Sequence, residues 1–79
     1  SPVYLGRLFK KLTSKSIADY INEVRMEKAR YFLVTSDYPI NDIAEKTGFI
    51  KNSYFYTSFK KIHGITPNEY RQKESRRKL

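Results

Sequence analysis

The segment PINDIAEKTGFIKNSYFYTSFKKIHGITPNEYR, residues 39–71, carries the pattern that decides the fold. Near its start, Ile40, Ile43 and Ala44 recur at the spacing of one face of a helix. Gly48 follows, and glycine most readily takes the left-handed conformation in which a helix ends and the chain turns sharply. A second helical pattern begins a few residues later. The segment therefore predicts two helices joined by a tight turn.

The second helix of this segment has one apolar face and one polar face. Phe55, Phe59 and Ile62 fall at positions i, i+4 and i+7, and we expect them to be buried. Phe49, which precedes this helix, is expected to fill the angle between the two helices. The opposite face carries short polar groups, an aromatic ring and a lysine: Ser53, Tyr56, Thr57 and Lys60. Such a face suits hydrogen bonding in a groove of DNA.

The composition of the 79-residue chain excludes several classes of function. The chain is long enough for one small domain, and no apolar run approaches the roughly 20 residues of a membrane span. There is no cysteine and a single histidine, His63, so thiol catalysis and a zinc site are both excluded. The sequence has no glycine-rich phosphate loop and no paired acids on a common face. We therefore expect no enzyme, no catalytic residue, no metal site and no cofactor.

Positive charge is concentrated in two parts of the chain. Sixteen basic and eight acidic residues give a net charge of +8 at pH 7. Residues 1–15 contain four basic side chains and residues 48–63 contain three lysines, and neither range contains an acid. Residues 16–47 contain four basic and six acidic side chains. Two separated basic segments suit the neutralisation of phosphates at two places on a duplex, although charge by itself is also compatible with a role in solubility alone.

The two basic segments belong to an internal duplication with an offset of 50 residues. The identical pairs are Tyr4/Tyr54, Phe9/Phe59, Lys10/Lys60, Lys11/Lys61 and Tyr20/Tyr70. Each copy predicts a basic amphipathic helix, a short turn and a further helix. A capping box is predicted at the start of that further helix, from Ser16 with Asp19 or from Thr66 with Glu69. Because the lysine pairs occupy equivalent positions, we expect the two copies to expose the same type of basic surface.

Residues 17–34 contain no glycine or proline and are predicted to form one helix, about 27 Å long at 1.5 Å per residue. The apolar residues of this helix change face midway. One side carries Ile17, Tyr20, Ile21 and Val24, and nearly the opposite side carries Met26, Ala29 and Leu33. A helix with this pattern packs first against one unit and then against another. Its length approaches one turn of B-DNA, about 34 Å, the separation at which two helices can enter successive major grooves.

Several spaced motifs resemble the signature of AraC/XylS-type transcriptional regulators. They are Ile43-Ala44, Gly48-Phe49, Ser53-Tyr54-Phe55, Phe59-Lys60-Lys61, Gly64 and Thr66-Pro67-Asn68-Glu69-Tyr70-Arg71. The resemblance covers nearly the whole chain and implies an all-α fold with two helix-turn-helix units, of the homeodomain-like three-helix type, joined by a long helix. It assigns residues 1–15 to the recognition helix of the first unit, 16–36 to the linker helix and 39–79 to the second unit with its C-terminal helix. The first unit is then incomplete, and we expect the chain to be truncated at its N-terminus.

The resemblance also implies a function and its residues. It implies sequence-specific binding of double-stranded DNA at a promoter or operator, and transcription regulation in the bacterial cytoplasm. It implies RNA polymerase as a partner and an upstream sensory or receiver domain, with no role for a membrane. The base-reading positions are Val3, Gly6, Arg7, Asn52, Ser53, Tyr56 and Thr57. The positions facing backbone phosphates are Lys10, Lys11, Lys51, Lys60 and Lys61. Arg7 is suited to guanine, because its guanidinium can donate two hydrogen bonds to O6 and N7.

Some positions leave alternatives open. Ile50 cannot cap a helix, so the second recognition helix is expected to begin near Asn52, which is then either a cap or a base reader. Ser14 stands where the other copy has Gly64, and we expect it to take a strained left-handed conformation. Gly6, in the middle of a short helix, indicates either a close approach of DNA or a neutral solvent position.

The first basic helix carries an apolar stripe at positions i, i+3, i+4 and i+7, formed by Leu5, Leu8, Phe9 and Leu12. We expect this stripe to be buried. In the family that the sequence resembles, however, the helices that cover it lie upstream. The remaining cover is then the long helix, another molecule or nothing.

Three further expectations concern charged residues. Arg25 is expected either to pair with Asp42 or Glu45 or to lie along the surface with its stem packed. The basic end RQKESRRKL, residues 71–79, is expected to be a disordered tail, with contact to flanking phosphates as the alternative. The alternative function for the whole chain is a basic helical adaptor that binds acidic protein or anionic surfaces.

Overall fold

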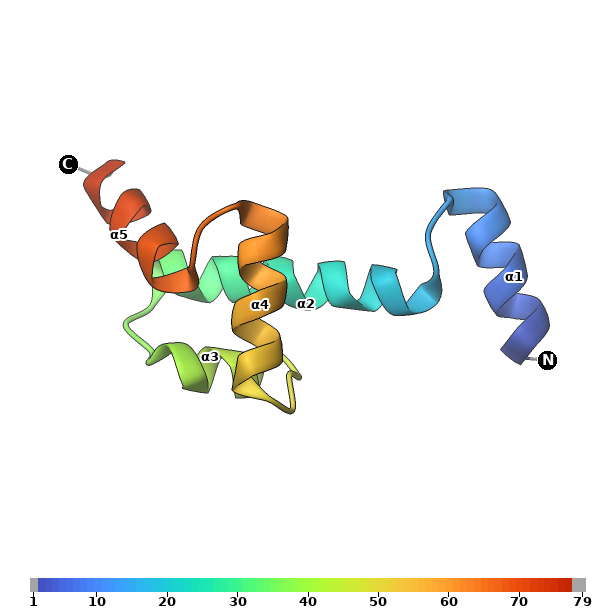
Figure 1. The fold of residues 1–79 in the computed structure, drawn as a ribbon, viewed down its shortest axis with the longest axis horizontal. Coiled ribbons are helices and arrows are strands. Elements are labelled where there is room, and N and C mark those ends of the chain that lie inside the picture. Colours follow the sequence, from blue (N-terminus) through green and yellow to red (C-terminus); the bar gives the residue numbers. More distant parts are fainter. Residues whose placement is uncertain (1, 78–79) are drawn as a thin grey trace.

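A computed structural model of the protein describes residues 2–77 as five α-helices, so the all-α prediction is confirmed (Figure 1). The helices are α1 (Pro2–Thr13), α2 (Ile17–Thr35), α3 (Ile40–Lys46), α4 (Asn52–His63) and α5 (Pro67–Arg77). The long helix α2 forms the axis of the molecule. In Figure 1, α1 stands at one end of α2, and α3, α4 and α5 gather at the other end.

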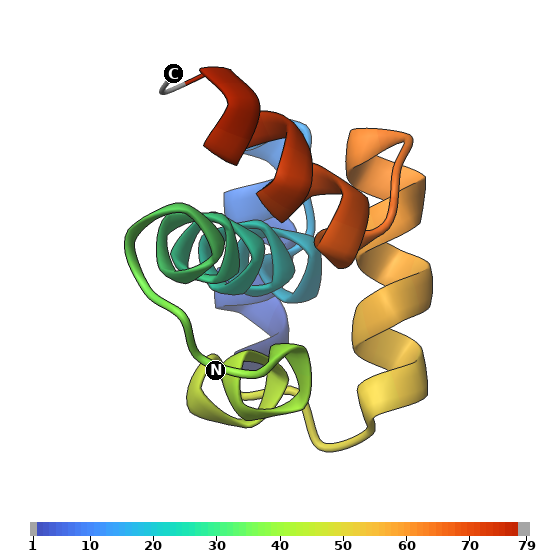
Figure 2. The ribbon, with the colours of Figure 1, turned by 90° about the vertical axis from the view of Figure 1, so that its left-hand side faces the viewer.

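The hydrophobic core lies between the C-terminal half of α2 and the helices α3, α4 and α5, which surround α2 on three sides in Figure 2. Its fully or almost fully buried members are Met26, Ala29, Leu33, Ile43, Ala44, Phe49, Phe55 and Phe59. These include the α3 and α4 residues that the helical spacing predicts to be inside, except Ile40, which is half-buried against the core, and Ile62, which is 50% exposed. The core thus belongs to one unit, the second helix-turn-helix.

The turn between α3 and α4 has the geometry that the sequence predicts. Gly48 has φ +96°, in the left-handed region. Phe49 follows with only 5% of its surface exposed, and its ring lies 5.1 Å from that of Phe55. A Cβ atom at position 48 would also lie 2.9 Å from Nε of Arg25, so the turn is closed by an arginine that packs over it.

The long helix changes its buried face midway, as its apolar pattern predicts. Met26, Ala29 and Leu33 are buried in the core. Ile17, Tyr20, Ile21 and Val24 remain 39 to 49% exposed on the N-terminal half. The helix has 19 residues, one more than predicted, and spans about 28 Å at 1.5 Å per residue. The N-terminal half of α2 therefore separates α1 from the core.

The prediction of a buried stripe on α1 is wrong for the residues that the structure describes. Leu5 is 58% exposed, Leu8 38% and Leu12 75%, while Phe9 is half-buried against the ring of Tyr20. The reason is the position of α1, which stands away from α3, α4 and α5 (Figure 1). In the second unit the equivalent Phe55 and Phe59 are fully buried, because α2 and α3 cover them there.

The basic C-terminal end is helical where the structure describes it, so the expectation of a disordered tail from residue 71 is wrong as far as Arg77. Helix α5 continues to Arg77, and residues 78–79 lie outside the described range. Arg71 explains the order at the start of this segment. Its Nε donates a hydrogen bond to the carbonyl oxygen of Leu33 (3.2 Å), and its guanidinium also donates to that of Ser36 (3.3 Å). An arginine thus caps the C-terminal carbonyls of α2 and ties α5 to it.

Replacing Arg71 by methionine should lower the free energy of unfolding by about 1.5 to 2 kcal/mol, because two carbonyl groups at the end of α2 lose a charged donor. Thermal unfolding followed by circular dichroism measures this loss. The exposed Lys73 on the same helix provides the control, and Lys73→Met should change the free energy of unfolding by less than about 0.5 kcal/mol. Equal midpoints for the two variants would contradict the capping role.

Arg25 adopts the second of its two predicted arrangements. No ion pair joins it to Asp42 or Glu45 within residues 2–77, and its side chain is exposed while its guanidinium packs over Gly48. The guanidinium of Arg25 therefore lies over the backbone of the α3–α4 turn and not beside an acid.

Candidate nucleic-acid interface

The internal duplication is present in the backbone as well as in the sequence. Helix α1 covers residues 2–13 and α4 covers residues 52–63, so both boundaries differ by the same 50 residues as the sequence repeat. After each helix comes one left-handed residue, Ser14 with φ +63° and Gly64 with φ +80°. The left-handed serine is the strained conformation predicted from its alignment with glycine.

The helix that follows each turn begins in the same way in both units. The hydroxyl of Ser16 accepts a hydrogen bond from the N–H of Asp19 (3.0 Å), and that of Thr66 accepts one from the N–H of Glu69 (3.1 Å). In the second unit the carboxylate of Glu69 also accepts from the N–H of Thr66 (3.0 Å), which completes a capping box. These bonds from Thr66 hold the pKa of Glu69 below its ordinary value.

An equivalent pair of rings holds each recognition helix against the helix after it. The rings of Phe9 and Tyr20 lie 5.4 Å apart, edge to face, and those of Phe59 and Tyr70 lie 5.6 Å apart in the same type of arrangement. The repeated rings and caps give α1 and α4 a similar attachment to the helices that follow them. Figures 1 and 2 show that α1 and α4 both run upward from their N-terminal ends, in roughly the same direction.

Most side chains predicted to read bases are exposed. On α1, Val3 is 64% exposed and Arg7 is also exposed. Gly6 is half-buried, yet a Cβ added there would meet no atom within 4 Å, so the glycine relieves no contact inside the protein. On α4, three of the predicted side chains are exposed: Asn52, Ser53 and Thr57. The α1 positions and these α4 positions form two accessible surfaces at the N-terminal halves of the two helices.

Tyr56 differs from the other predicted base readers. It is half-buried and packs against the core, with its ring 5.8 Å from that of Phe55. Its hydroxyl donates a hydrogen bond to Oδ1 of Asn41 (3.2 Å), which joins α4 to α3. Tyr56 is therefore partly accessible at the surface. Its hydrogen bond to Asn41 also holds α3 and α4 together.

The start of α4 tests one of the two roles considered for Asn52, that of a helix cap. The residue before the helix is Lys51, whose side chain makes no capping hydrogen bond, and Asn52 is the first residue inside the helix. The possibility that Asn52 is a cap is therefore wrong. Ile50 is 99% exposed and takes no part in the core. Without a side-chain cap, the first N–H groups of α4 are available to an external acceptor, as a phosphate would be.

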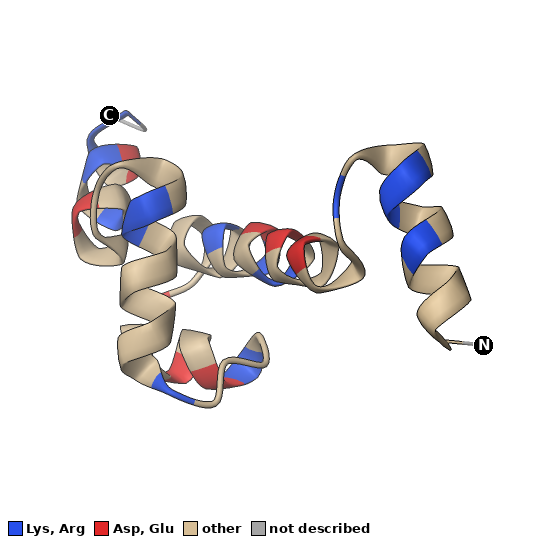
Figure 3. Cartoon of the chain, turned by 45° about the vertical axis from the view of Figure 1, so that its right-hand side comes forward, with Lys and Arg blue, Asp and Glu red and all other residues tan. Residues whose placement is uncertain are grey.

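The five lysines predicted to face phosphates are all exposed: Lys10, Lys11, Lys51, Lys60 and Lys61. Figure 3 shows basic residues on α1, on α4 and on α5, while the N-terminal half of α2 between α1 and α4 carries acidic ones. The charge segregation read from the sequence therefore persists in space.

Sequence reasoning missed the polar contacts that bridge separate elements. Lys15 and Glu23 form an ion pair (Nζ to Oε2, 2.8 Å) across the α1–α2 turn, and their separation of eight residues corresponds to no helical contact spacing. The Asn41–Tyr56 bond joins residues that are 15 apart, and no local pattern indicates it. Two ion pairs do have a local signal, Glu27 with Arg30 on α2 and Glu74 with Arg77 on α5, each at i and i+3.

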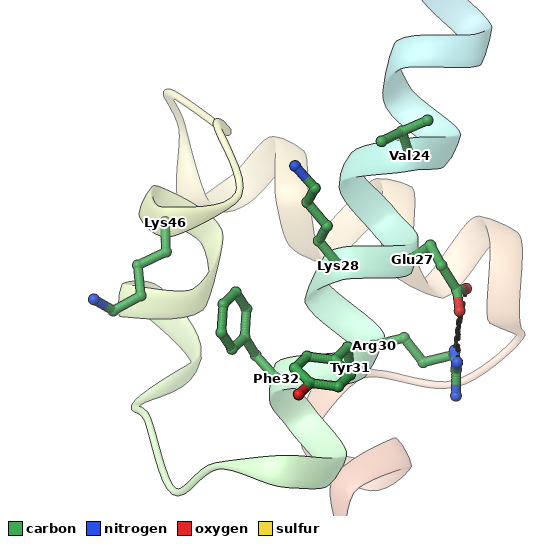
Figure 4. A pocket seen from close by; sticks show the side chains of 7 residues that line it. All are labelled: Val24, Glu27, Lys28, Arg30, Tyr31, Phe32 and Lys46. Carbon is green, nitrogen blue, oxygen red and sulfur yellow. Dashed lines mark hydrogen bonds and ion pairs between the residues drawn. The ribbon is translucent and has the colours of Figure 1, made fainter.

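A hollow on another side of α2 is separate from the residues predicted to contact DNA. It is lined by Val24, Glu27, Lys28, Arg30, Tyr31, Phe32 and Lys46 (Figure 4). Nε of Arg30 lies 3.1 Å from both carboxylate oxygens of Glu27, and this contact holds the pKa of Glu27 below its ordinary value. Figure 4 shows Phe32 pointing from α2 toward α3, with Glu27 and Arg30 on the other side of α2.

Residues 2–77 provide no helix of the length and apolar character that crossing a membrane requires. Within the same residues, no three side chains of the metal-binding types are grouped to hold an ion.

Comparison with known proteins agrees with this arrangement. The family profile described as a helix-turn-helix domain matches residues 1–73. The transcriptional regulatory protein YesN of Bacillus subtilis strain 168 is 41% identical over 76 residues, which are 94% of this chain and 21% of that protein. The chain thus spans about a fifth of the length of this curated relative.

Two solved structures show the same fold. The C-terminal domain of the two-component response regulator YesN from Fusobacterium nucleatum has a TM-score of 0.84 and 44% identity, covering 90% of this chain and 69% of that one. The DNA-binding domain of AdpA, solved in complex with a target DNA, has a TM-score of 0.91 and 27% identity, covering 98% of this chain and 69% of that one. With a profile match along 73 residues and two equivalent recognition helices, the chain belongs to the AraC/XylS-type family of helix-turn-helix transcriptional regulators.

Proposed function

We propose that the chain binds double-stranded DNA with α1 and α4 in successive major grooves on one side of the duplex, and that it regulates transcription in this way. One observation carries the proposal. Two basic helices of equal length, with equivalent turns and caps, stand at separate places along one rigid helix and run in roughly the same direction (Figure 1). The length of α2, about 28 Å, is close to the pitch of the duplex, about 34 Å.

The exposed polar groups near the N-terminal ends of α1 and α4 would read the bases. Arg7 offers a planar fork of donors that matches O6 and N7 of guanine. Asn52 can make the corresponding pair of hydrogen bonds to adenine. Ser53 and Thr57 offer hydroxyl groups to a base edge or a phosphate. Gly6 supports a close approach of DNA to α1, because it leaves open space above the helix backbone.

The longer protein would connect this binding to a signal. The similarity to the C-terminal domain of a two-component response regulator supports an upstream receiver domain whose state controls access of α1 and α4 to DNA. RNA polymerase is then the proposed partner in transcription, and the cytoplasm is the proposed location. These assignments rest on the family and on no contact within residues 2–77.

A salt titration tests the proposed function. Binding to a 30-base-pair promoter duplex, measured by fluorescence anisotropy, should weaken with salt along a log-log slope near −5 if about six phosphates are neutralised. The promoter site should be preferred over a scrambled duplex by several kcal/mol. Equal affinity for both duplexes and for an unrelated polyanion such as heparin would instead favour the basic adaptor.

Arg7→Ala should reduce the preference for the promoter site about tenfold, because one bidentate base contact accounts for about 1 to 3 kcal/mol of discrimination. Affinity for the scrambled duplex should fall much less. Arg76→Ala on α5 is the matched control, since it removes the same charge from an exposed position at the other end of the molecule. If both variants keep the same ratio of promoter to scrambled affinity, Arg7 does not read a base.

A further inference from the structure

A recess with two acids and two lysines lies between α4 and the N-terminal half of α2, next to the α1–α2 turn. It is lined by Lys15, Asp19, Asn22, Glu23, Tyr54, Thr57, Ser58, Lys61 and Ile62. Thr57 and Lys61 belong to the face of α4 proposed to contact DNA, and the acids come from the N-terminal half of α2. Figure 3 shows the acidic residues on α2 between α4 and α1. A duplex that engages both helices has to pass this part of the surface.

Lys15 is one of the two lysines that line this recess, and it is already paired with an acid. Its Nζ lies 2.8 Å from Oε2 of Glu23, and both side chains are 49% exposed. The lysine is held in the turn between α1 and α2, and its partner lies nearly two turns into α2. The pair is therefore accessible to a ligand, and its lysine is a cation that a phosphate could take over.

Opposite a bound duplex, the carboxylate of Glu23 would oppose binding in two ways. It occupies a lysine that would otherwise neutralise a phosphate, and it places a negative charge opposite the polyanion. Affinity for DNA of any sequence depends on the number of phosphates that lysines and arginines neutralise, because each neutralised phosphate releases a counterion. A duplex bound by such contacts alone loses one of them as long as Lys15 stays with Glu23.

We propose that Glu23 is a negative determinant of DNA binding, which holds Lys15 away from the phosphates and lowers the affinity for duplexes irrespective of their sequence. This proposal rests on the proposed function, because it assumes that DNA spans α1 and α4. Its consequence is a lower background of non-specific binding. A regulator needs this property because non-operator sites vastly outnumber its operator.

The test measures the affinity of the full chain for a 30-base-pair duplex of arbitrary sequence as a function of salt. Glu23→Gln should bind this duplex about five- to tenfold more tightly at 0.1 M salt, and its log-log slope should be steeper by about 0.9, the value of one added phosphate contact. Glutamine has nearly the helix propensity of glutamate, and circular dichroism verifies that α2 is unchanged. The matched control is Asp37→Asn, which makes the same change of net charge in the connection at the far end of α2 and should leave the slope unchanged.

The double variant Lys15→Gln/Glu23→Gln separates the lysine from the general effect of charge. Relative to Lys15→Gln alone, it should show no steeper slope, because the released lysine is no longer present. The proposal is overturned if Glu23→Gln has the wild-type slope and the affinity of Asp37→Asn. The proposed function fails in a different way, through a wild-type chain that does not bind duplex DNA or binds it without dependence on salt.

Discussion

Replacing Phe59 by alanine is expected to lower the free energy of unfolding by about 3 to 5 kcal/mol, the largest effect of any single substitution proposed for this chain. Phe59 is fully buried, and its ring contacts those of Phe55 (6.0 Å), His63 (4.3 Å) and Tyr70 (5.6 Å). Its removal leaves a cavity where α4, α5 and α2 meet. Because native domains are stable by only about 5 to 15 kcal/mol, this loss removes a large share of the stability of the second unit and should lower its urea midpoint strongly.

Urea denaturation followed by circular dichroism measures the loss, and the NMR titration of His63 gives a second readout. Burial lowers the pKa of His63 in the folded protein, so unfolding should return the pKa to about 6.5. Ile62→Ala is the control, because Ile62 lies on the same helix and is half exposed. It should change the free energy of unfolding by less than about 1 kcal/mol. A Phe59→Ala variant with the urea midpoint of the wild type would show that the core does not hold this unit together.

The parts of the fold that the sequence predicted well depend on local signals. Gly48 marks a left-handed turn by residue type alone, and Ser16 and Thr66 mark helix starts by their spacing from an acid three residues later. The 50-residue offset also predicts that α1 and α4 begin and end at equivalent positions, because similar local sequences favour similar helix boundaries. Each of these signals lies within a few residues and needs no knowledge of tertiary contacts.

The exposed stripe of α1 shows where such signals end. Leu5 and Phe55 occupy equivalent positions on equivalent amphipathic helices, yet one is 58% exposed and the other is fully buried. Helical spacing identifies the apolar face of a helix, but burial depends on whether another element covers that face. Helices α2 and α3 cover Phe55. Within residues 2–77, no helix covers Leu5 in the same way.

The candidate interface was predictable to a similar degree. Exposure of Arg7, Asn52 and Thr57 follows from their position opposite an apolar face. The hydroxyl bond of Tyr56 to Asn41 does not, because it depends on how α3 and α4 cross. The sequence pattern places Arg71 in a solvated basic tail for the same reason. Its carbonyl partners, Leu33 and Ser36, are more than 30 residues away along the chain.

The second large effect is expected from the double variant Lys60→Gln/Lys61→Gln, which should weaken binding to duplex DNA about 60-fold at 0.1 M salt. Two lost phosphate contacts reduce the log-log salt slope by about 1.8, and extrapolation from 1 M to 0.1 M salt converts this slope into the stated loss. Both lysines are exposed in the last turn of α4, and Lys61 also lines the recess between α4 and α2. Because the lysines carry no sequence information, promoter and scrambled duplexes should lose affinity alike.

The equivalent variant on the other helix makes this experiment decisive for the two-helix arrangement. Lys10→Gln/Lys11→Gln removes the repeated lysine pair from α1, and it should lower the affinity and the slope by a similar amount. Lys28→Gln/Lys73→Gln removes the same charge from exposed positions on α2 and α5, and the slope should then stay close to that of the wild type. If the α4 pair affects the slope and the α1 pair does not, only one recognition helix contacts DNA. The internal duplication would then reflect shared ancestry of the two units and not a shared role, since equal helices at both ends of α2 predict equal losses.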